Sequence, residues 1–389
     1  MHTSTNHDVK LAAANGESQP LKLLMVAGAR PNFMKIAPLV RAVQARAANG
    51  NGSCTFHSRL VHTGQHYDAA MSDVFFTELG LPKPDINLEA GSGSHAVQTA
   101  RVMERFDAVC ENEQPDWVVV VGDVNSTVAC TLVCAKRSIR VAHVEAGLRS
   151  FDRSMPEEIN RIVTDSIADL LLTPSEDANE NLKREGIAPN KIRLVGNVMI
   201  DSLVDNVARS RQRNILQTLG LESRRFVYVT LHRPSNVDRE ESLSEIMARL
   251  SELSSKLPVV FPIHPRTRKM LGESRVSAPL AIGLKLVDPI GYHDSLCLTE
   301  HARFVLTDSG GLQEESTFFR TPCLTLRPNT ERPVTVDIGS NRLTTVANLS
   351  RDIEQVLAEP ERMGAIPPLW DGRSADRILD AIASASLSR

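Results

Sequence analysis

Three carboxylates in the first half of the chain are placed as a catalytic set would be. Asp123 and Glu145 each follow a short apolar run, "WVVVV" and "RVAHV", and Glu157 lies in "MPEEINR". Neighbouring carboxylates raise one another's pKa, so that one can hold a proton while another accepts one. The pattern indicates general acid–base chemistry. The structural alternatives are a helix cap formed by Asp123 or Asn125, and a helix that starts at Pro156 with acids in its first turn.

The segment "TDSGGLQEES", from Thr307 to Ser316, is the strongest signal for a bound phosphate. An apolar run ends, two glycines follow and a helical pattern begins. Gly310 and Gly311 have no Cβ to keep a phosphate from the backbone, and the first amides of a helix attract an anion. The alternative is a tight strand-to-helix turn capped by Ser309. The chain has neither GxxxxGKS/T nor GxGxxG, which argues against a P-loop hydrolase and against a dinucleotide cofactor.

Several other charged residues stand at similar boundaries. Arg30 and Lys35, in "GARPNFMK", lie where an apolar run gives way to a helical pattern, a position that suits an anionic ligand. His232 ends "RFVYVTLH" and is either a catalytic or ligand-binding group or a structural histidine. A phosphate would repel Glu315, so we expect it to face sugar hydroxyls unless it is an ordinary acid near a helix start. Arg332, in "NTERPVTV", is either a partner of a phosphate or carboxylate or a surface residue.

Cysteine and histidine are not arranged as metal ligands. The six cysteines, at positions 54, 110, 130, 134, 297 and 323, contain no CxxC pair and no zinc spacing. Cys130 and Cys134 stand at i and i+4 on an apolar helical stretch, where buried thiols are expected. Because no HExxH or HxH pattern occurs, the sequence predicts no metal site. The cysteine usage fits a reducing compartment.

Length and composition favour two ordinary globular domains. The chain has 389 residues, of which 42% are hydrophobic, and a net charge of −3, which implies neither nucleic acid nor an acidic surface as partner. No apolar run approaches the roughly 20 residues that a membrane span needs. Residues 1–20 have no continuous signal-peptide core and are expected to form a flexible tail. We therefore expect a cytoplasmic protein.

Short apolar runs alternate with longer helical patterns along the chain. This alternation is typical of βαβ units, and nearly all-apolar strands indicate parallel sheets covered on both faces. We expect one Rossmann-like domain at 21–200, a second at 201–370, and a final amphipathic helix at 371–389 that packs back on the first domain. The expected strands lie within 21–27, 58–63, 117–122, 140–145, 170–174, 192–196, 225–232, 259–264, 284–289, 304–309 and 322–326.

The unusual polar residues gather at the ends of these runs. They are Gly28–Arg30, Gly122–Asp123, Glu145–Gly147, His232–Arg233, His264 and Ser309–Gly311. Ligands of open α/β sheets bind outside the carboxyl ends of the strands. If the strand ends of the two domains face each other, these groups line one interdomain cleft.

Taken together, the motifs resemble the non-hydrolysing UDP-N-acetylglucosamine 2-epimerase family. The matching segments, in order from about residue 22 to residue 380, are "GARPNFMKIAPL", "GDVNST", "HVEAGLRS", "MPEEINR", "GNVMIDSL", "TLHRPSN" and "LTDSGGLQEES" with "TERPVTV". The resemblance implies an isomerase with a GT-B-like α/β fold, whose two Rossmann-like domains hold the UDP-sugar substrate in the cleft. It implies no cofactor, and it suggests a homodimer.

The family's reaction interconverts UDP-N-acetylglucosamine and UDP-N-acetylmannosamine by loss of UDP, formation of 2-acetamidoglucal and re-addition. Carried over by motif, the catalytic residues would be Asp123, Glu145, Glu157 and His232, with the histidine near the diphosphate. The substrate-binding residues would be Arg30, Lys35, Ser309, Gly310, Gly311, Glu315 and Arg332. Alternatives are an epimerase of a related UDP-sugar such as UDP-2,3-diacetamido-glucuronic acid, a GT-B UDP-sugar glycosyltransferase, and a non-catalytic sugar-nucleotide-binding protein.

The sequence departs from the family pattern at three places. Asn32 stands where many members have Glu, and Ser295, in "GYHDSL", replaces an aromatic residue. A stretch that binds a second, activating UDP-sugar in some members reads "QHYDAAM" here, where Gln65 is kept and Asp68 differs, while Arg101 matches another contact. These differences bear on the choice of sugar and on activation by a second ligand.

Overall fold

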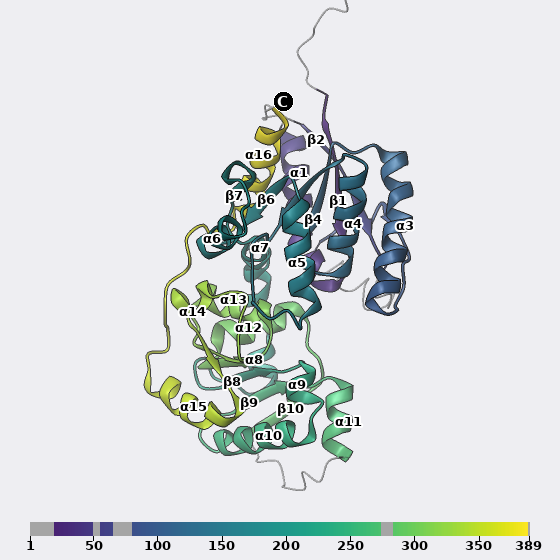
Figure 1. The fold of residues 1–389 in the computed structure, drawn as a ribbon. Coiled ribbons are helices and arrows are strands. Elements are labelled where there is room, and N and C mark those ends of the chain that lie inside the picture. Colours follow the sequence, from purple (N-terminus) through teal and green to yellow (C-terminus); the bar gives the residue numbers. More distant parts are fainter. Residues whose placement is uncertain (1–18, 50–54, 65–79, 274–282, 388–389) are drawn as a thin grey trace, which may run out of the picture.

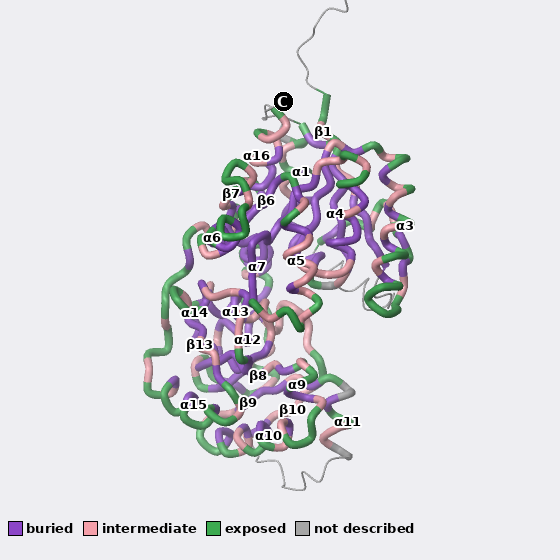
Figure 2. Tube along the Cα trace, viewed as in Figure 1, coloured by how far each residue is buried: buried purple, intermediate pink, exposed green. Residues whose placement is uncertain are grey.

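Two parallel sheets, each with helices on both faces, make up the fold (Figure 1). The computed structural model describes residues 19–49, 55–64, 80–273 and 283–387. The strands are the most deeply buried elements in both halves, whereas the outer faces of the helices are exposed (Figure 2). This is the α/β architecture that the alternation of apolar runs and helical patterns predicts.

Within the described residues, the first sheet has seven parallel strands in the order β3-β2-β1-β4-β5-β6-β7. Its strands are β1 (Leu21–Ala27), β2 (Phe56–His62), β3 (Ile86–Asn87), β4 (Trp117–Val121), β5 (Arg140–Val144), β6 (Leu170–Thr173) and β7 (Ile192–Leu194). The helices of this half are α1 (Arg30–Asn49), α3 (His95–Glu113), α4 (Asn125–Lys136), α5 (Pro156–Ile167), α6 (Glu176–Arg184), the short η1 (Pro189–Lys191) and α7 (Val198–Arg211). The strand order reverses between β1 and β4, where such sheets bind ligands.

In the part of the chain that the structure describes, the second sheet has six parallel strands in the order β10-β9-β8-β11-β12-β13. Its strands are β8 (Val227–Thr230), β9 (Val259–Pro262), β10 (Leu284–Val287), β11 (Phe304–Thr307), β12 (Cys323–Leu326) and β13 (Asn341–Thr344). The helices of this half are α8 (Ile215–Thr218), α9 (Pro234–Val237), α10 (Glu240–Ser254), α11 (Pro265–Glu273), α12 (Tyr292–His301), α13 (Gly310–Phe319), α14 (Val334–Asp337), η2 (Val346–Asn348) and α15 (Leu349–Ala358), and the chain ends with α16 (Ser374–Leu387), which lies with the first sheet. Here the order reverses between β8 and β11.

The strands are apolar because both of their faces are covered. All residues of β4 are buried. Successive side chains of a strand point to opposite faces, so Trp117, Val119 and Val121 pack with α1 and α16, whereas Val118 and Val120 pack with α3 and α4. The thiols of Cys130 and Cys134, on α4, are buried in this second cluster, as predicted.

Helix α7 contacts both halves of the molecule. It packs against α1 and α16 on one side and against α12 and α13 on the other. The Ser202 hydroxyl donates a hydrogen bond to the Met34 carbonyl, and Asn206 Oδ1 lies 2.9 Å from His293 Nε2. One helix therefore connects the two sheets through contacts on both of its sides.

The last helix, α16, returns to the first sheet. Its buried residues Ile378, Leu379 and Ile382 join the core formed by α1 and β4. The carboxylate of Asp201, on α7, accepts hydrogen bonds from the amide of Ser374 at 3.1 Å and from the next amide at 2.7 Å. Asp201 thus satisfies amide groups at the start of α16, which otherwise have no intrahelical partner.

The expected strands are present, and two further ones were not expected. β3 has only two residues, and β13 reads "NRLT", without an apolar run. Both are edge strands, whose pairing on one side only requires less apolar sequence. The division of the chain at residues 200 and 370 stays a prediction.

Candidate active site

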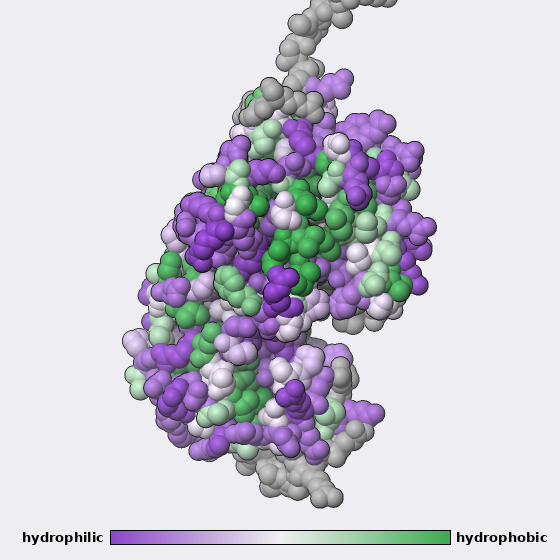
Figure 3. All heavy atoms as spheres, in the orientation of Figure 1, coloured by the Kyte–Doolittle hydropathy of each residue, from purple (hydrophilic) through white to green (hydrophobic). Residues whose placement is uncertain are grey.

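Charged side chains from the two sheets meet where the carboxyl ends of the strands face each other. Glu145 follows β5 of the first sheet, and Arg332 lies after β12 of the second. Arg332 Nη2 is 3.6 Å from Glu145 Oε1, and Lys35, on α1, forms an ion pair with Glu145 Oε2. The surface is hollowed between the two halves on the face drawn in Figure 3. The two halves therefore face each other across one site, as predicted.

The backbone around Glu145 is shaped for this ion pair. Glu145 has a φ of 70°, in the left-handed region that side chains other than glycine rarely adopt. The adjacent Gly122, after β4, has a φ of 66°. A Cβ at Gly122 would lie 2.8 Å from Lys35 Nζ and 3.3 Å from Glu145 Oε2. Glycine is therefore needed beside the ion pair, and unusual backbone geometry of this kind is common at functional sites.

Glu145 is a carboxylate rather than a carboxylic acid. It is 4% exposed, and burial by itself would raise its pKa. The charges of Lys35 and Arg332 outweigh burial and hold the pKa of Glu145 below its ordinary value. Glu145 can therefore accept a proton at neutral pH. The expectation that clustered acids raise one another's pKa is wrong for Glu145, because its contacts are cations.

Arg332 is held by carboxylates on three sides. Besides Glu145, it contacts Glu314, whose Oε1 accepts a hydrogen bond from Nε at 2.6 Å, and Glu331, which pairs with Nη1. Burial, assisted by the charge of Glu145, raises the pKa of Glu314. A Cβ at Gly310 would lie 2.7 Å from Arg332 Nη1. Gly310 is thus required by the arginine that lies over the first turn of α13.

The N-terminus of α13 is the other part of the predicted phosphate site. Ser309 is the residue before the helix, and its side chain makes no capping hydrogen bond, so the alternative interpretation of Ser309 as a side-chain cap is not supported. A Cβ at Gly311 would meet its nearest atoms only at 3.9 and 4.0 Å. These are ordinary van der Waals distances, so no close contact requires glycine at position 311, which lies at a helix end whose dipole attracts an anion.

His232 is oriented by a buried acid. Its side chain is 64% exposed, and its Nδ1 lies 2.8 Å from an oxygen of Asp308, which follows β11 and is 0% exposed. Asp308 also accepts hydrogen bonds from the Arg233 amide and from Asn236 Nδ2, both at 2.9 Å. Burial would raise the pKa of Asp308, but the hydrogen bonds from His232 and its other donors hold it below its ordinary value. An ionised Asp308 thus fixes the imidazole at the end of β8.

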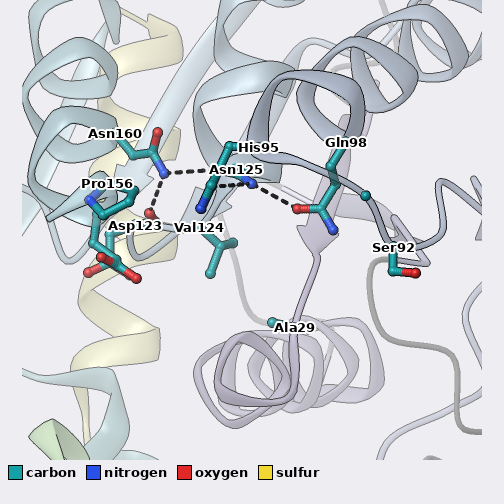
Figure 4. A pocket seen from close by; sticks show the side chains of 11 residues that line it. Ala29, Ser92, His95, Gln98, Asp123, Val124, Asn125, Pro156 and Asn160 are labelled. Carbon is teal, nitrogen blue, oxygen red and sulfur yellow. Dashed lines mark hydrogen bonds between the residues drawn. The ribbon is translucent and has the colours of Figure 1, made fainter. Parts of the chain in front are cut away.

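Asp123 and Glu157 line a cavity of about 280 Å³ at the carboxyl end of the first sheet (Figure 4). Asp123 pairs with Arg161 of α5. It does not cap α4, whose N-cap residue is Val124, so the alternative interpretation of Asp123 as a helix cap is wrong. Pro156 does begin α5, as the sequence predicts.

The wall of this cavity is made of amide and imidazole groups. Asn125 Nδ2 donates to Gln98 Oε1 at 2.8 Å, and Asn125 Oδ1 lies 3.2 Å from His95 Nδ1 (Figure 4). Asn160 Nδ2 donates to the carbonyl of Asp123 at 2.9 Å. Amide groups both donate and accept hydrogen bonds, which suits the hydroxyl and acetamido groups of a sugar.

Glu315 lies in a separate buried environment on α13. It is 6% exposed, and burial, together with the charge of Glu314, raises its pKa to about 8. Tyr228 and Tyr292 both lie within electrostatic range of Glu315, and burial raises the pKa of each tyrosine hydroxyl. Tyr228 Oη lies 2.8 Å from the hydroxyl of Ser295. At neutral pH Glu315 is largely protonated and can donate a hydrogen bond to a ligand oxygen.

The structure divides the predicted site residues into groups rather than one set. Lys35, Glu145, Arg332 and Gly310 are in contact, and Asp123 shares its cavity with Glu157. His232 stands at the end of β8, and Ser309 and Gly311 are at the start of α13. Arg30 is the first residue of α1, the helix that carries Lys35. Their roles remain predictions.

Sequence reasoning missed the residues that hold the charged groups in place. Arg161 and Glu158 lie one helical turn apart on α5, and an oxygen of Glu158 is 2.7 Å from Arg161 Nη2. The i, i+3 spacing in "EEINR" was a usable signal for this pair. No local signal in the sequence identifies Asp308 as a partner of His232 or Glu314 as a partner of Arg332, because these contacts join separate segments. Glu331, by contrast, is the residue next to Arg332 in the chain.

Part of the predicted second-ligand stretch is outside the described residues, namely Gln65 and Asp68. Arg101 is described, and it donates hydrogen bonds to the carbonyls of Ala90 at 3.4 Å and Ser92 at 3.2 Å.

Within residues 19–49, 55–64, 80–273 and 283–387, no group of three histidine, cysteine, aspartate or glutamate side chains could hold a metal ion. Across the same residues, no helix combines the length and apolar character needed to cross a membrane.

Comparisons with known proteins agree with the resemblance stated from the motifs. A family model described as UDP-N-acetylglucosamine 2-epimerase matches residues 50–383. The chain is similar to a UDP-N-acetylglucosamine 2-epimerase from Methanocaldococcus jannaschii, with 40% identity covering 92% of this chain and 98% of the relative. It is also similar to a UDP-2,3-diacetamido-2,3-dideoxy-D-glucuronate 2-epimerase from Pseudomonas aeruginosa, with 41% identity covering 84% of this chain and 89% of the relative.

Among solved structures, the fold matches the crystal structure of the Methanocaldococcus jannaschii UDP-GlcNAc 2-epimerase in complex with UDP-GlcNAc and UDP. The TM-score is 0.81 at 39% identity, covering 94% of this chain and 100% of that chain. The predicted GT-B-like fold and the predicted isomerase class are thereby confirmed. Since the family model spans most of the chain and these relatives cover nearly all of it, the chain belongs to the UDP-N-acetylglucosamine 2-epimerase family.

Proposed function

We propose that the protein inverts C2 of UDP-N-acetylglucosamine to give UDP-N-acetylmannosamine, and catalyses the reverse, without hydrolysing the nucleotide sugar. One observation carries the proposal: Glu145, an ionised carboxylate, contacts Arg332, which lies over the first turn of α13. A proton acceptor and an anion-binding helix end are therefore adjacent. This arrangement suits the removal of a proton from the carbon next to the one that loses a diphosphate.

The chemistry explains why both parts are needed. The hydrogen on C2 is not beside a carbonyl, so it is a poor acid. When the C1–O bond breaks, its electron pair leaves with UDP, and the cationic C1 acidifies C2–H. A carboxylate takes that proton, and the C–H electrons form the C1=C2 bond of 2-acetamidoglucal. Delivery of a proton to the opposite face of C2 and return of the UDP oxygen to C1 complete the inversion.

The proposed roles follow the position of each group. Glu145 accepts or returns the proton on one face of C2, and Asp123 with Glu157 serves the sugar from the cavity of the first sheet. His232 donates to the diphosphate, held in place by Asp308. The nucleotide is bound by Arg30, Lys35, Ser309, Gly310, Gly311, Glu315 and Arg332. Cations and helix amides aimed at a departing diphosphate stabilise the charge that develops on it.

Glu315 suits the ribose of the nucleotide better than the diphosphate. Its raised pKa, about 8, means that a proton neutralises it at pH 7, so it does not repel the nearby anion. A buried carboxyl group with few partners gains from hydrogen bonds to the two ribose hydroxyls.

Product identity in the absence of any acceptor tests the proposal. Incubated with UDP-N-acetylglucosamine alone, the protein should give a mixture of the two UDP-sugars that is also reached from UDP-N-acetylmannosamine. Proton NMR of the anomeric region distinguishes both epimers from free sugar. Release of N-acetylmannosamine and UDP would indicate a hydrolysing enzyme instead. No change in the UDP-sugar, with transfer only after a sugar or lipid acceptor is added, would indicate a glycosyltransferase.

The relative from Pseudomonas aeruginosa raises a second substrate, UDP-2,3-diacetamido-2,3-dideoxy-glucuronate. The cavity that contains Asp123 and Glu157 disfavours it. The described residues that line this cavity include both carboxylates and neither lysine nor arginine. Arg161 pairs with Asp123, so Glu157 is the acid that would repel a uronate carboxylate there, whereas it would not repel the neutral hydroxymethyl group of N-acetylglucosamine. We therefore propose the neutral sugar as the substrate.

A further inference from the structure

A buried histidine joins the two loops that carry Asp123 and Glu145. His143 lies on β5, two residues before Glu145, and is 0% exposed. Its Nε2 lies 2.9 Å from the carbonyl oxygen of Gly122, the residue before Asp123. Its Nδ1 lies 2.7 Å from Oδ1 of Asp165, a buried residue on α5. Neither His143 nor Asp165 reaches the substrate cavity, and no catalytic step assigned above uses them.

The surroundings of the imidazole determine where its protons are. A carbonyl oxygen only accepts hydrogen bonds, so Nε2 facing Gly122 carries a hydrogen. The other carboxylate oxygen of Asp165 accepts a hydrogen bond from the Gly147 amide at 3.0 Å and lies 2.7 Å from Arg149 Nη1. With these donors, Asp165 is an ionised acceptor, so Nδ1 of His143 carries a hydrogen as well. Burial would raise the pKa of Asp165, but His143 and Arg149 hold it below its ordinary value.

We infer that His143 is an imidazolium at neutral pH and acts as a positioning residue, fixing the Gly122 carbonyl and keeping Glu145 ionised. This inference rests on the proposed role of Glu145 in proton transfer. His143 does not touch the reacting atoms and acts only through Gly122 and Glu145.

The paired His143 and Asp165 hold both catalytic loops by their backbones. The histidine binds the Gly122 carbonyl, and the aspartate binds the Gly147 amide, so the segments before Asp123 and after Glu145 are joined through one buried pair. Gly122 and Gly147 both have positive φ values, 66° and 80°. Glycine adopts such values without strain, whereas Glu145 has a φ of 70°, which side chains rarely adopt and which persists only where surrounding contacts determine it.

The charge of His143 also reaches Glu145 directly. The charged groups around the pair are Asp165 on α5, Arg149 in the loop after β5, Glu145 after β5, Lys35 on α1 and Arg332 beyond Glu145. Burial opposes ionisation of Glu145, while Lys35, Arg332 and His143 all lower its pKa. A neutral His143 would leave Glu145 with one cation fewer, and its pKa would rise.

The protonation state can be measured without any assay of activity. In protein labelled with ¹⁵N-histidine, the ring nitrogens of His143 are assigned by their absence in His143→Gln. At pH 7 we expect both to show the chemical shift of protonated imidazole nitrogens. One protonated and one unprotonated nitrogen would overturn the inference. Because this readout needs no turnover, it stands even if the proposed epimerase function fails.

The substitution Asp165→Asn separates charge from geometry. The amide oxygen can still accept from Gly147 and Arg149, and the amide nitrogen can donate to Nδ1 of His143, which then becomes neutral. We expect kcat to fall roughly 10- to 100-fold, by analogy with the loss of a carboxylate that orients a metal-ligating histidine. Since Glu145 must be ionised to accept a proton, the acid limb of the kcat–pH profile should move to higher pH, while KM changes little.

Asp169→Asn is the matched control. Asp169 caps the other end of β5, where it accepts a hydrogen bond from the Val141 amide at 2.9 Å. This variant should keep the wild-type kcat and pH profile. A wild-type pH profile for Asp165→Asn, or an equal loss in both variants, would show that Asp165 is only structural and would overturn the positioning role. Absence of epimerisation by the wild-type protein would refute the proposed function instead.

Discussion

Glu145→Gln should lower kcat by about 10² to 10⁴-fold, the usual range for loss of a general acid or base. Glutamine keeps the size of the side chain and can still accept a hydrogen bond from Lys35, but it cannot take a proton from C2. Asp123→Asn should cause a loss in the same range if Asp123 serves the proton transfers from its own cavity. Initial rates of UDP-N-acetylmannosamine formation, followed by proton NMR, give kcat for each variant.

The control for these variants is an acid with an ion pair away from the site. Glu113→Gln removes a carboxylate that pairs with Arg59 at 2.5 Å at the end of α3, and it should leave kcat unchanged. UDP binding and circular dichroism establish that Glu145→Gln is folded. Near-native turnover in both Glu145→Gln and Asp123→Asn would contradict the assignment of the carboxylates.

Arg332→Gln should have the second large effect, on both stability and turnover. Arg332 neutralises three buried acids, and its side chain is 11% exposed. Breaking a buried ion pair by removing one partner costs about 3–5 kcal/mol of unfolding free energy. Loss of a donor that stabilises developing charge lowers kcat by about 10² to 10³-fold. Thermal unfolding and steady-state rates measure the two effects separately.

A second substitution distinguishes stability from catalysis. Glu314→Gln removes one of the acids that Arg332 neutralises. The double variant Arg332→Gln/Glu314→Gln therefore leaves fewer buried acids without their cation than the single variant Arg332→Gln does. Its melting temperature should recover part of the loss, while its kcat should stay as low as that of Arg332→Gln. Recovery of turnover together with stability would show that Arg332 has only a structural role.

The fold was predictable from short-range patterns. A run such as "WVVVV" is apolar at every position because its strand is buried on both faces, and the glycines and polar residues that follow mark the carboxyl end. The two edge strands were missed for the complementary reason. β13, "NRLT", pairs on one side only and carries polar side chains, so it has no apolar run to detect.

The candidate site was predictable as a location but not as a network. Strand ends indicated Glu145 and the start of α13, and the ordered motifs indicated Arg332. The sequence could not show that Gly310 is needed for contact with Arg332, since that requires the loop after β12 to lie over α13. Nor could it show that cations, rather than other acids, determine the pKa of Glu145. Both facts depend on segments that are distant in the chain.

The support for His232 illustrates the same limit. Asp308 lies within "TDSGG", which the sequence marks as a phosphate loop, yet its carboxylate points to the end of β8 and holds His232. Adjacent strands β8 and β11 bring the two residues together. Knowing that strand pairing in advance would have been enough to predict the contact.

Deuterium incorporation at C2 tests the proposed elimination and re-addition most directly. UDP-N-acetylglucosamine is incubated with the protein in deuterated water, and C2 of both UDP-sugars is followed by proton NMR. If a carboxylate removes the C2 proton and a proton from solvent replaces it, the C2 hydrogen signal should disappear from both epimers as they approach equilibrium. Epimerisation that keeps the original hydrogen on C2 would contradict the proposed mechanism.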